Sequence, residues 1–123
     1  MQHSKEFKYM HSLSAGVDEV CAIKSFRDST IPLTNARGAF ADILSEYVLL
    51  GMLYHGKHVE YFQQQKNKAE WKGMPAENMN TKTFVVVGYG NIGSTCAKAA
   101  KAAFGMKVIG VNKFPEMVTR DEA

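Results

Sequence analysis

Residues 83–111 constrain the fold of this chain more than any other part of it. An apolar run, TFVVV at 83–87, leads into a glycine-rich hexapeptide, and an alanine-rich stretch then ends at Gly105, before a second apolar run at 107–111. Short apolar runs bounded by glycine are typical of strands, whereas an alanine-rich stretch favours a helix. We therefore expect a buried strand at 83–87, a helix over about 91–103 and a second strand at 107–111, joined as a β-α-β unit.

The glycine-rich hexapeptide matches the pattern G-x-G-x-x-G. In this pattern the first glycine makes the tight turn out of the strand, the second lets a pyrophosphate approach the backbone, and the third lets helix and strand pack closely. The phosphates lie on free N–H groups at the helix N-terminus, where the helix dipole favours negative charge. Because the flanking strand and helix give the required context, we expect the loop to bind NAD or NADP. The residues assigned to the cofactor are Gly88, Tyr89, Gly90, Asn91, Ile92 and Gly93.

The residue at the end of the second strand decides which dinucleotide fits. An acidic residue there accepts a hydrogen bond from the ribose 2′-hydroxyl of NAD, and a cation accommodates the 2′-phosphate of NADP. Asn112 stands at this position, 19 residues after Gly93, and Lys113 follows it. We assign both residues to cofactor binding, and the missing acid with the adjacent base favours NADP slightly. The alternative is that Lys113 is a solvated surface lysine and that Asn112 binds the ribose hydroxyl of NAD.

In the first third of the chain, the sequence predicts short strands and a short helix or turn. Apolar and polar residues alternate over 7–16, which predicts a short strand that ends in a small-residue loop. Residues 17–26 are expected to form a short helix or turn. A second brief strand is expected around 31–34, with Pro32 at its edge or its first position, because proline cannot donate to a strand ladder.

A single long helix is predicted over about 38–65, with a polar last third. Apolar residues recur there at three- and four-residue spacing, which is the stripe of an amphipathic helix. Trp71 is expected to pack as an anchor in the connector at 67–82. The predicted stripe consists of Phe40, Ile43, Leu44, Tyr47, Val48, Leu50, Leu53 and Tyr54.

Composition excludes several classes of protein. Hydrophobic residues make up 46% of the 123 residues and the net charge is +3, which is ordinary for a globular domain and argues against disorder. The charges are interspersed, so we expect neither a nucleic-acid nor a membrane surface. With no signal-like segment and only Cys21 and Cys96, expected as buried thiols, the predicted location is the cytoplasm.

With those residues placed, the chain resembles the D-isomer-specific 2-hydroxyacid dehydrogenase family along nearly its whole length. The segments that carry the resemblance are, in order, HSLSAGVDEV, IPLTNARG, GAFADILSEYVLLGMLY, VVVGYGNIG and AAFGMKVIGVNK. The resemblance implies an α/β fold: a partial Rossmann-type unit, preceded by the end of a flavodoxin-like substrate domain and a long interdomain helix. Residues 1–37 would end the first substrate-domain segment, and residues 38–123 would hold the interdomain helix and the start of the NAD(P)-binding domain. The chain would be an internal fragment, about a third of a family enzyme.

The family transfers a hydride between a nicotinamide and a small 2-hydroxy or 2-keto acid, and this is the function that the resemblance implies. Backbone N–H groups of a small-residue loop hold the substrate carboxylate in the family, which matches Ala15 and Gly16. Ser14 would add a hydroxyl donor or be a plain turn serine. Asn35 would bond substrate or cap the coming helix.

No catalytic or metal-binding residue is assigned. The family's catalytic Arg, Glu and His match no residue here, and none of the four histidines (His3, His11, His55 and His58) is assigned in their place. His55 and His58, toward the polar end of the long helix, are read as solvated or partly packed side chains. The chain alone is therefore expected to be inactive, and a homodimer through residues 40–54 is expected because family members dimerise there. The alternative is a non-catalytic, corepressor-like dinucleotide-binding module. Adenosylhomocysteinase has a similar glycine loop, but no place for SAGVD or LTNARG.

Overall fold

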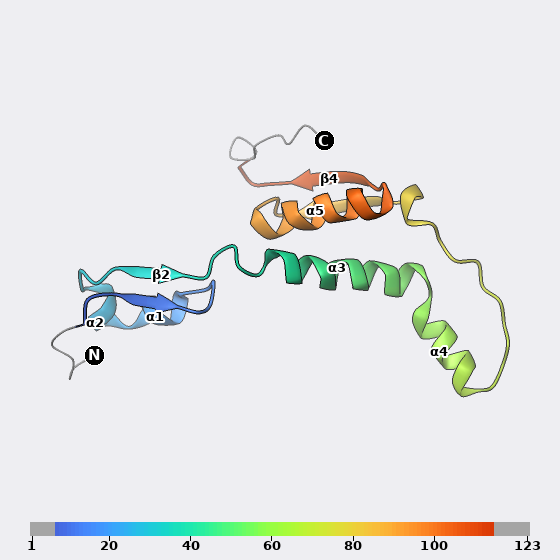
Figure 1. The fold of residues 1–123 in the computed structure, drawn as a ribbon, viewed down its shortest axis with the longest axis horizontal. Coiled ribbons are helices and arrows are strands. Elements are labelled where there is room, and N and C mark those ends of the chain that lie inside the picture. Colours follow the sequence, from blue (N-terminus) through green and yellow to red (C-terminus); the bar gives the residue numbers. More distant parts are fainter. Residues whose placement is uncertain (1–6, 115–123) are drawn as a thin grey trace. The chain divides into compact units, whose positions relative to one another are not determined.

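The computed structural model describes residues 7–114, and the chain divides after Phe40 into two compact units. The first unit has two short parallel strands, β1 (Met10–Ser12) and β2 (Leu33–Asn35), in a register that pairs His11 with Thr34. The amide of Met10 donates to the carbonyl of Pro32 (2.9 Å), so the proline precedes the strand and serves only as an acceptor. Figure 1 shows both strands in blue and cyan.

Two short helices connect these strands, α1 (Asp18–Ala22) and α2 (Lys24–Arg27). Ile23 separates them because its backbone is extended, and the buried side chain of Phe26 anchors α2. The expected helix or turn over residues 17–26 is thus a pair of one-turn helices. The expectation that Cys21 is buried is wrong, since this residue is exposed at the end of α1.

The second unit contains the predicted β-α-β arrangement. Strand β3 (Thr83–Val87), helix α5 (Asn91–Phe104) and strand β4 (Lys107–Val111) follow one another, and the two strands are parallel in the register Val87 to Val111. Gly105 ends α5 in the left-handed conformation (φ 64°), and its amide donates to the carbonyl of Lys101. The predicted element boundaries are confirmed to within one residue.

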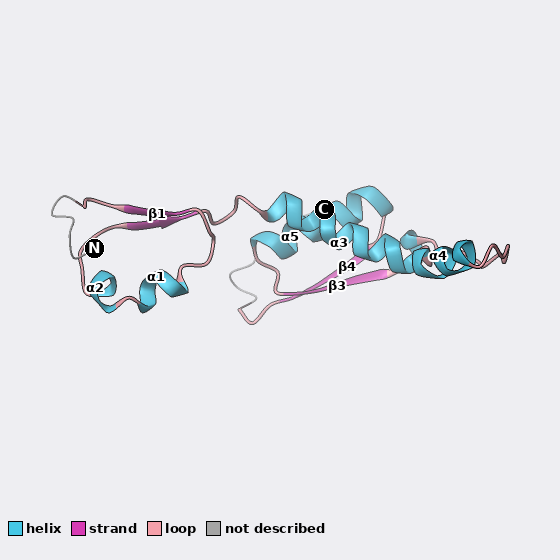
Figure 2. Ribbon diagram, turned by 90° about the horizontal axis from the view of Figure 1, so that it is seen from below, coloured by secondary structure: helices cyan, strands magenta, loops and turns pink. Residues whose placement is uncertain are grey.

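Helix α3 (Ala41–Gly56) packs against α5, and both helices lie on the same side of the two-stranded sheet, as Figure 2 shows. The core of the unit is centred on Ala100 of α5 and on two methionines that flank the strands, Met79 and Met106. Side chains from three elements pack against this core: Leu49, Met52, Leu53, Phe84 and Phe104.

The expectation of one continuous helix over 38–65 is also wrong. Helix α3 ends at Gly56, and a separate helix, α4 (Val59–Asn67), begins after His58, whose backbone is left-handed (φ 53°). The connector crosses the end of α3 at this break, where the amide of Glu77 donates to the carbonyl of Gly56 (3.2 Å). The ammonium of Lys57 donates to the carbonyl of Glu77 (2.6 Å). The connector continues into a short 3₁₀ turn at Met79–Thr81.

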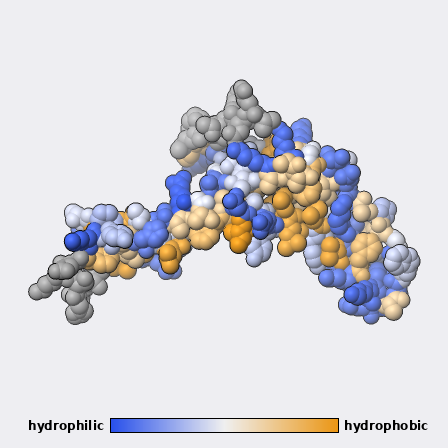
Figure 3. Space-filling model, in the orientation of Figure 1, coloured by the Kyte–Doolittle hydropathy of each residue, from blue (hydrophilic) through white to orange (hydrophobic). Residues whose placement is uncertain are grey.

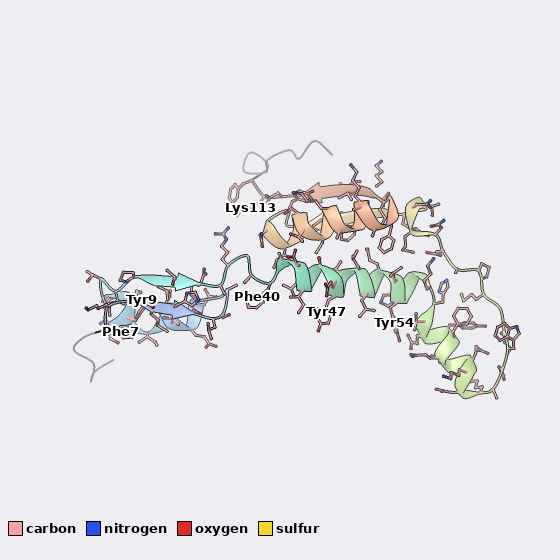
Figure 4. The ribbon with its side chains drawn as sticks, in the orientation of Figure 1. Phe7, Tyr9, Phe40, Tyr47, Tyr54 and Lys113 are labelled. Carbon is pink, nitrogen blue, oxygen red and sulfur yellow. The ribbon has the colours of Figure 1, made fainter. Side chains whose placement is uncertain are left out.

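Much of the predicted stripe on α3 faces solvent rather than the core. Tyr47 is 66% exposed and Leu50 is 60% exposed, with Ile43 and Leu44 beside them. The buried positions of α3 are instead Ala41, Ser45 and Gly56, and Gly56 lies against the side chain of Met79. Figure 3 shows hydrophobic side chains gathered along α3, and Figure 4 shows Tyr47 pointing away from α5.

Two further expectations of burial are wrong. Trp71 is 99% exposed, so it anchors nothing within the described residues. In β3 only Val86 is buried, whereas Val85 and Val87 are 53% and 85% exposed, because helices cover one face of the sheet only. Within residues 7–114, no helix is both long and apolar enough to cross a membrane.

Candidate dinucleotide-binding site

The glycine loop lies at the carboxyl edge of the parallel strand pair. Because β3 and β4 run in register, the loop after Val87 and the residues after Val111 leave the sheet side by side. The amide of Gly88 donates to the carbonyl of Val111 (2.8 Å), which ties the start of the loop to the end of β4. The structure thereby brings the loop and Asn112 to one edge, the edge at which ligands bind in open α/β sheets.

The first and third glycines of the loop are required by the chain itself. Gly88 has a left-handed φ of 95°, which a residue with a Cβ rarely adopts. A Cβ at Gly93 would collide with the carbonyl oxygen of Gly88 and would lie 2.9 Å from Cγ1 of Val86. The first glycine therefore makes the turn, and the third lets α5 start directly against β3.

The second glycine, Gly90, has neither a positive φ nor a close neighbour that would exclude a side chain. Gly90 has a negative φ (φ −94°, ψ −157°), so its backbone lies outside the left-handed region that favours glycine. A Cβ placed there would meet no atom of the described residues within 4 Å. Neither the backbone angles nor the packing of the described residues therefore requires glycine at this position.

The N-terminus of α5 is open for an anion. Gly90 is its N-cap and makes no side-chain bond, and the first turn carries no acidic residue. The first amide bonded in the helix is that of Ser94, which donates to the carbonyl of Gly90 (2.9 Å). The N–H groups of residues 91–93 have no acceptor within residues 7–114 and suit a phosphate. The hydroxyls of Ser94 and Thr95 both donate back to the carbonyl of Asn91 (3.1 and 2.8 Å).

The two residues assigned to the ribose follow β4 directly. Asn112 is half-buried and Lys113 is exposed. The ammonium of Lys113 lies 5.4 Å from the centroid of the Phe114 ring, a cation–π contact at the surface. Figure 4 labels this lysine at the end of β4.

Gly110 is a residue of this edge that the sequence patterns did not indicate. Gly110 of β4 lies under the ring of Tyr89, and a Cβ there would stand 3.0 Å from both Cγ and Cε2 of the tyrosine. The available signal was a glycine inside a strand run, since such glycines mark the close approach of another group. The contact partner could not be read from the sequence.

The four residues assigned to the substrate carboxylate form a cluster within the first unit. The side-chain amide nitrogen of Asn35 donates to the backbone carbonyl of Ala15 (2.8 Å). Its side-chain oxygen accepts from the backbone N–H of Arg37 (3.3 Å). The amide of Ala36 donates to the carbonyl of Ser14 (3.2 Å). The side chain of Asn35 thus bonds both the loop after β1 and the backbone that follows β2. The amides of Ala15 and Gly16 have no acceptor within the described residues.

The three histidines that the structure describes, His11, His55 and His58, do not gather into a site, and His3 lies outside the described residues. No group of three or more His, Cys, Asp or Glu side chains that could hold a metal exists within residues 7–114. His55 lies in the last turn of α3, and His58 lies at the break between α3 and α4. His11 bonds Thr34 across the strand pair (2.8 Å).

The family model described as D-isomer specific 2-hydroxyacid dehydrogenase, NAD binding domain, matches residues 49–123. Hydroxypyruvate reductase of Thermotoga maritima is 29% identical over 111 residues, which cover 89% of this chain and 36% of that protein. This chain thus spans about a third of the length of that curated relative.

Solved structures agree with this match. A D-isomer specific 2-hydroxyacid dehydrogenase family protein from Aeromonas salmonicida is 30% identical, with a TM-score of 0.79 over 92% of this chain and 35% of that one. The NADPH-dependent glyoxylate/hydroxypyruvate reductase of Sinorhizobium meliloti, in complex with NADP and sulfate, is 28% identical. Its TM-score is 0.70, over 84% of this chain and 32% of that one.

Proposed function

Because this chain belongs to the D-isomer specific 2-hydroxyacid dehydrogenase family, we propose that it is part of an NAD(P)-dependent oxidoreductase. The reaction is hydride transfer between the nicotinamide and C2 of a small 2-hydroxy or 2-keto acid. The bound cofactor supplies the hydride chemistry, and the protein supplies binding, orientation and electrostatics. The similarity to a hydroxypyruvate reductase and to a glyoxylate/hydroxypyruvate reductase supports this class of substrate.

The glycine loop holds the pyrophosphate of the cofactor in this proposal. The observation that carries it is Gly90, which neither its backbone conformation nor its packing requires to be glycine. A pyrophosphate that lies against this backbone would clash with a Cβ, and it would accept hydrogen bonds from the amides of residues 91–93. Asn91, Ile92 and Gly93 contribute through their backbone, since the amides and not the side chains begin the helix.

Asn112 and Lys113 bind the adenosine ribose, with a modest preference for NADPH. Asn112 hydrogen-bonds a ribose hydroxyl, and Lys113 is exposed at the same strand end and reaches a 2′-phosphate by leaving Phe114. The contact that it leaves is an exposed cation–π pair, which is weak.

The loop of residues 14–16 binds the substrate carboxylate. The free amides of Ala15 and Gly16 donate to it, the hydroxyl of Ser14 is exposed beside them, and Asn35 holds the loop in place. In this assignment residues 1–37 end the first segment of a substrate domain, and residues 38–123 hold the interdomain helices and the start of the cofactor domain. Since no catalytic residue is assigned, the chain alone binds cofactor without turning over substrate.

The assembly that we propose is a homodimer in the cytoplasm. The exposed apolar residues of α3 support it, since Tyr47 and Leu50 present a large unpaired surface to solvent.

The test is a titration of the chain with NADPH, followed by NMR. Gly90→Val should weaken NADPH binding at least about tenfold, because an extended backbone accepts valine without strain while the ligand meets its side chain. Gly73→Val is the matched control, since a Cβ at this exposed connector residue also meets no atom within 4 Å. Unchanged NADPH binding by Gly90→Val, or equal losses in both variants, would contradict the proposal.

A further inference from the structure

The ring of Tyr89 lies directly on the backbone of Gly110. A Cβ built at Gly110 would stand 2.5 Å from Cδ2 of the tyrosine and 3.0 Å from its Cγ and Cε2, which is closer than carbon atoms pack. The ring therefore occupies the space of any side chain at position 110. Gly110 is not among the glycines with positive φ, which are Gly38, Gly88 and Gly105. Its need for glycine comes from the tyrosine and not from backbone conformation.

This contact joins the two halves of the cofactor edge. Gly110 pairs in register with Val86, and Val86 packs beneath Gly93 at the start of α5. On the same rung of the sheet, β3 is thus covered by the helix start and β4 by the Tyr89 ring. The ring is a side-chain contact between the glycine loop and β4, alongside the backbone bond from Gly88 to Val111.

The distance between the glycine loop and the end of β4 matters because one cofactor molecule would contact both. Its pyrophosphate and its adenosine ribose are covalently joined, so the loop amides and Asn112 must stand at one fixed separation to bind both groups together. Asn112 follows Gly110 by two residues. A contact that fixes the loop on Gly110 therefore also fixes the loop relative to Asn112.

We propose that Tyr89 is a positioning residue that sets the separation between the pyrophosphate-binding amides and the ribose-binding Asn112, through its ring on Gly110. The inference rests on the proposed function and names the part of the site that decides the fit of the whole dinucleotide. Loss of the ring, or its displacement by a Cβ at position 110, weakens ligands that span both halves. A ligand that fills the loop alone does not depend on the separation.

The experiment titrates the chain and its variants with NADPH, which spans both halves, and with inorganic pyrophosphate, which fills the loop only. Tyr89→Ala and Gly110→Ala should each weaken NADPH binding about tenfold and leave pyrophosphate binding within about twofold. Tyr89→Phe keeps the ring and should retain the affinity of the wild type for NADPH. In the Tyr89→Ala background, Gly110→Ala should cause no further loss, because the methyl group then has room.

The outcomes distinguish the positioning role of Tyr89 from a merely structural role and from failure of the proposed function. If Tyr89→Ala and Gly110→Ala bind NADPH like the wild type, the positioning role is overturned while the proposed function stands. If pyrophosphate binding falls as much as NADPH binding, Tyr89 has only a structural role. If the wild type binds neither ligand, the proposed function fails, and the inference fails with it. Should Tyr89→Ala not fold, Gly110→Ala makes the same comparison, with Lys107→Ala at the far end of β4 as its control.

Discussion

The side-chain amide of Asn35 donates a 2.8 Å hydrogen bond to the carbonyl of Ala15, and this bond fixes the peptide plane that carries the amide of Gly16. A trans peptide is planar, with its C=O and N–H pointing in opposite directions. The Gly16 N–H is therefore directed away from Asn35, and Gly16 is exposed. An asparagine at the end of one strand thus orients a donor in the loop after the other.

Replacement of Asn35 by aspartate should release this loop. A carboxylate cannot donate to the Ala15 carbonyl and repels it, so the order parameters of Ala15 and Gly16 should fall in NMR relaxation measurements. Thr34→Val is the control, because it removes an exposed bond to His11 and leaves the loop contacts intact. Unchanged order parameters in Asn35→Asp would mean that the backbone bond between Ala36 and Ser14 is sufficient.

Gly93→Ala should destabilise the second unit by about 1–3 kcal/mol, because the added methyl group meets the backbone of Gly88, which cannot move without opening the turn. Gly51→Ala is the matched control. A Cβ there meets no atom within 4 Å, and alanine in a helix interior should be more stable by up to about 1 kcal/mol. Urea unfolding measures both changes. Equal stabilities would show that α5 can shift from β3 without loss.

Leu50→Glu should prevent self-association of the chain. The wild type should sediment as a dimer through the exposed apolar side of α3, and a buried unpaired carboxylate should make the variant monomeric. Gln63→Glu adds the same charge at an exposed position of α4 and should leave the dimer intact. A monomeric wild type at the same concentrations would contradict the proposed assembly.

The two cysteines should differ in reactivity. Burial raises the pKa of the Cys96 thiol above its usual range, whereas Cys21 is exposed. Iodoacetamide at pH 8 should therefore alkylate Cys21 while Cys96 reacts only after unfolding. The stability that the neutral Cys96 thiol contributes is complete below the pKa of the unfolded thiol and is lost as the pH rises through the folded pKa. Mass spectrometry of the alkylated Cys21→Ser and Cys96→Ser variants checks that Cys21 reacts before Cys96.

How much the sequence predicts depends on the range of the interaction. The β-α-β unit follows from local patterns, and the structure confirms its strands at Thr83–Val87 and Lys107–Val111. The break at His58 does not follow from the apolar spacing, and the contact made there, from the amide of Glu77 to the carbonyl of Gly56, joins residues far apart along the chain.

The sequence pattern also could not predict which side of α3 faces solvent. This helix is apolar around most of its circumference, so periodicity does not decide which side packs on α5. Within the site, the glycine roles follow from the motif. The contact between Tyr89 and Gly110, in contrast, needs the strand register and the path of the loop.

Lys113→Ala should reduce the preference of the chain for NADPH over NADH. An exposed lysine at the end of β4 attracts a 2′-phosphate by a solvent-screened interaction, so we expect NADPH to bind several-fold more tightly than NADH in the wild type. High salt and Lys113→Ala should each shrink this advantage, and NADH binding should change little. Lys107→Ala, at the opposite end of the same strand, is the control and should leave the ratio unchanged. Equal or tighter binding of NADH by the wild type would mean that Asn112 binds the ribose hydroxyl and that Lys113 remains a surface lysine on Phe114.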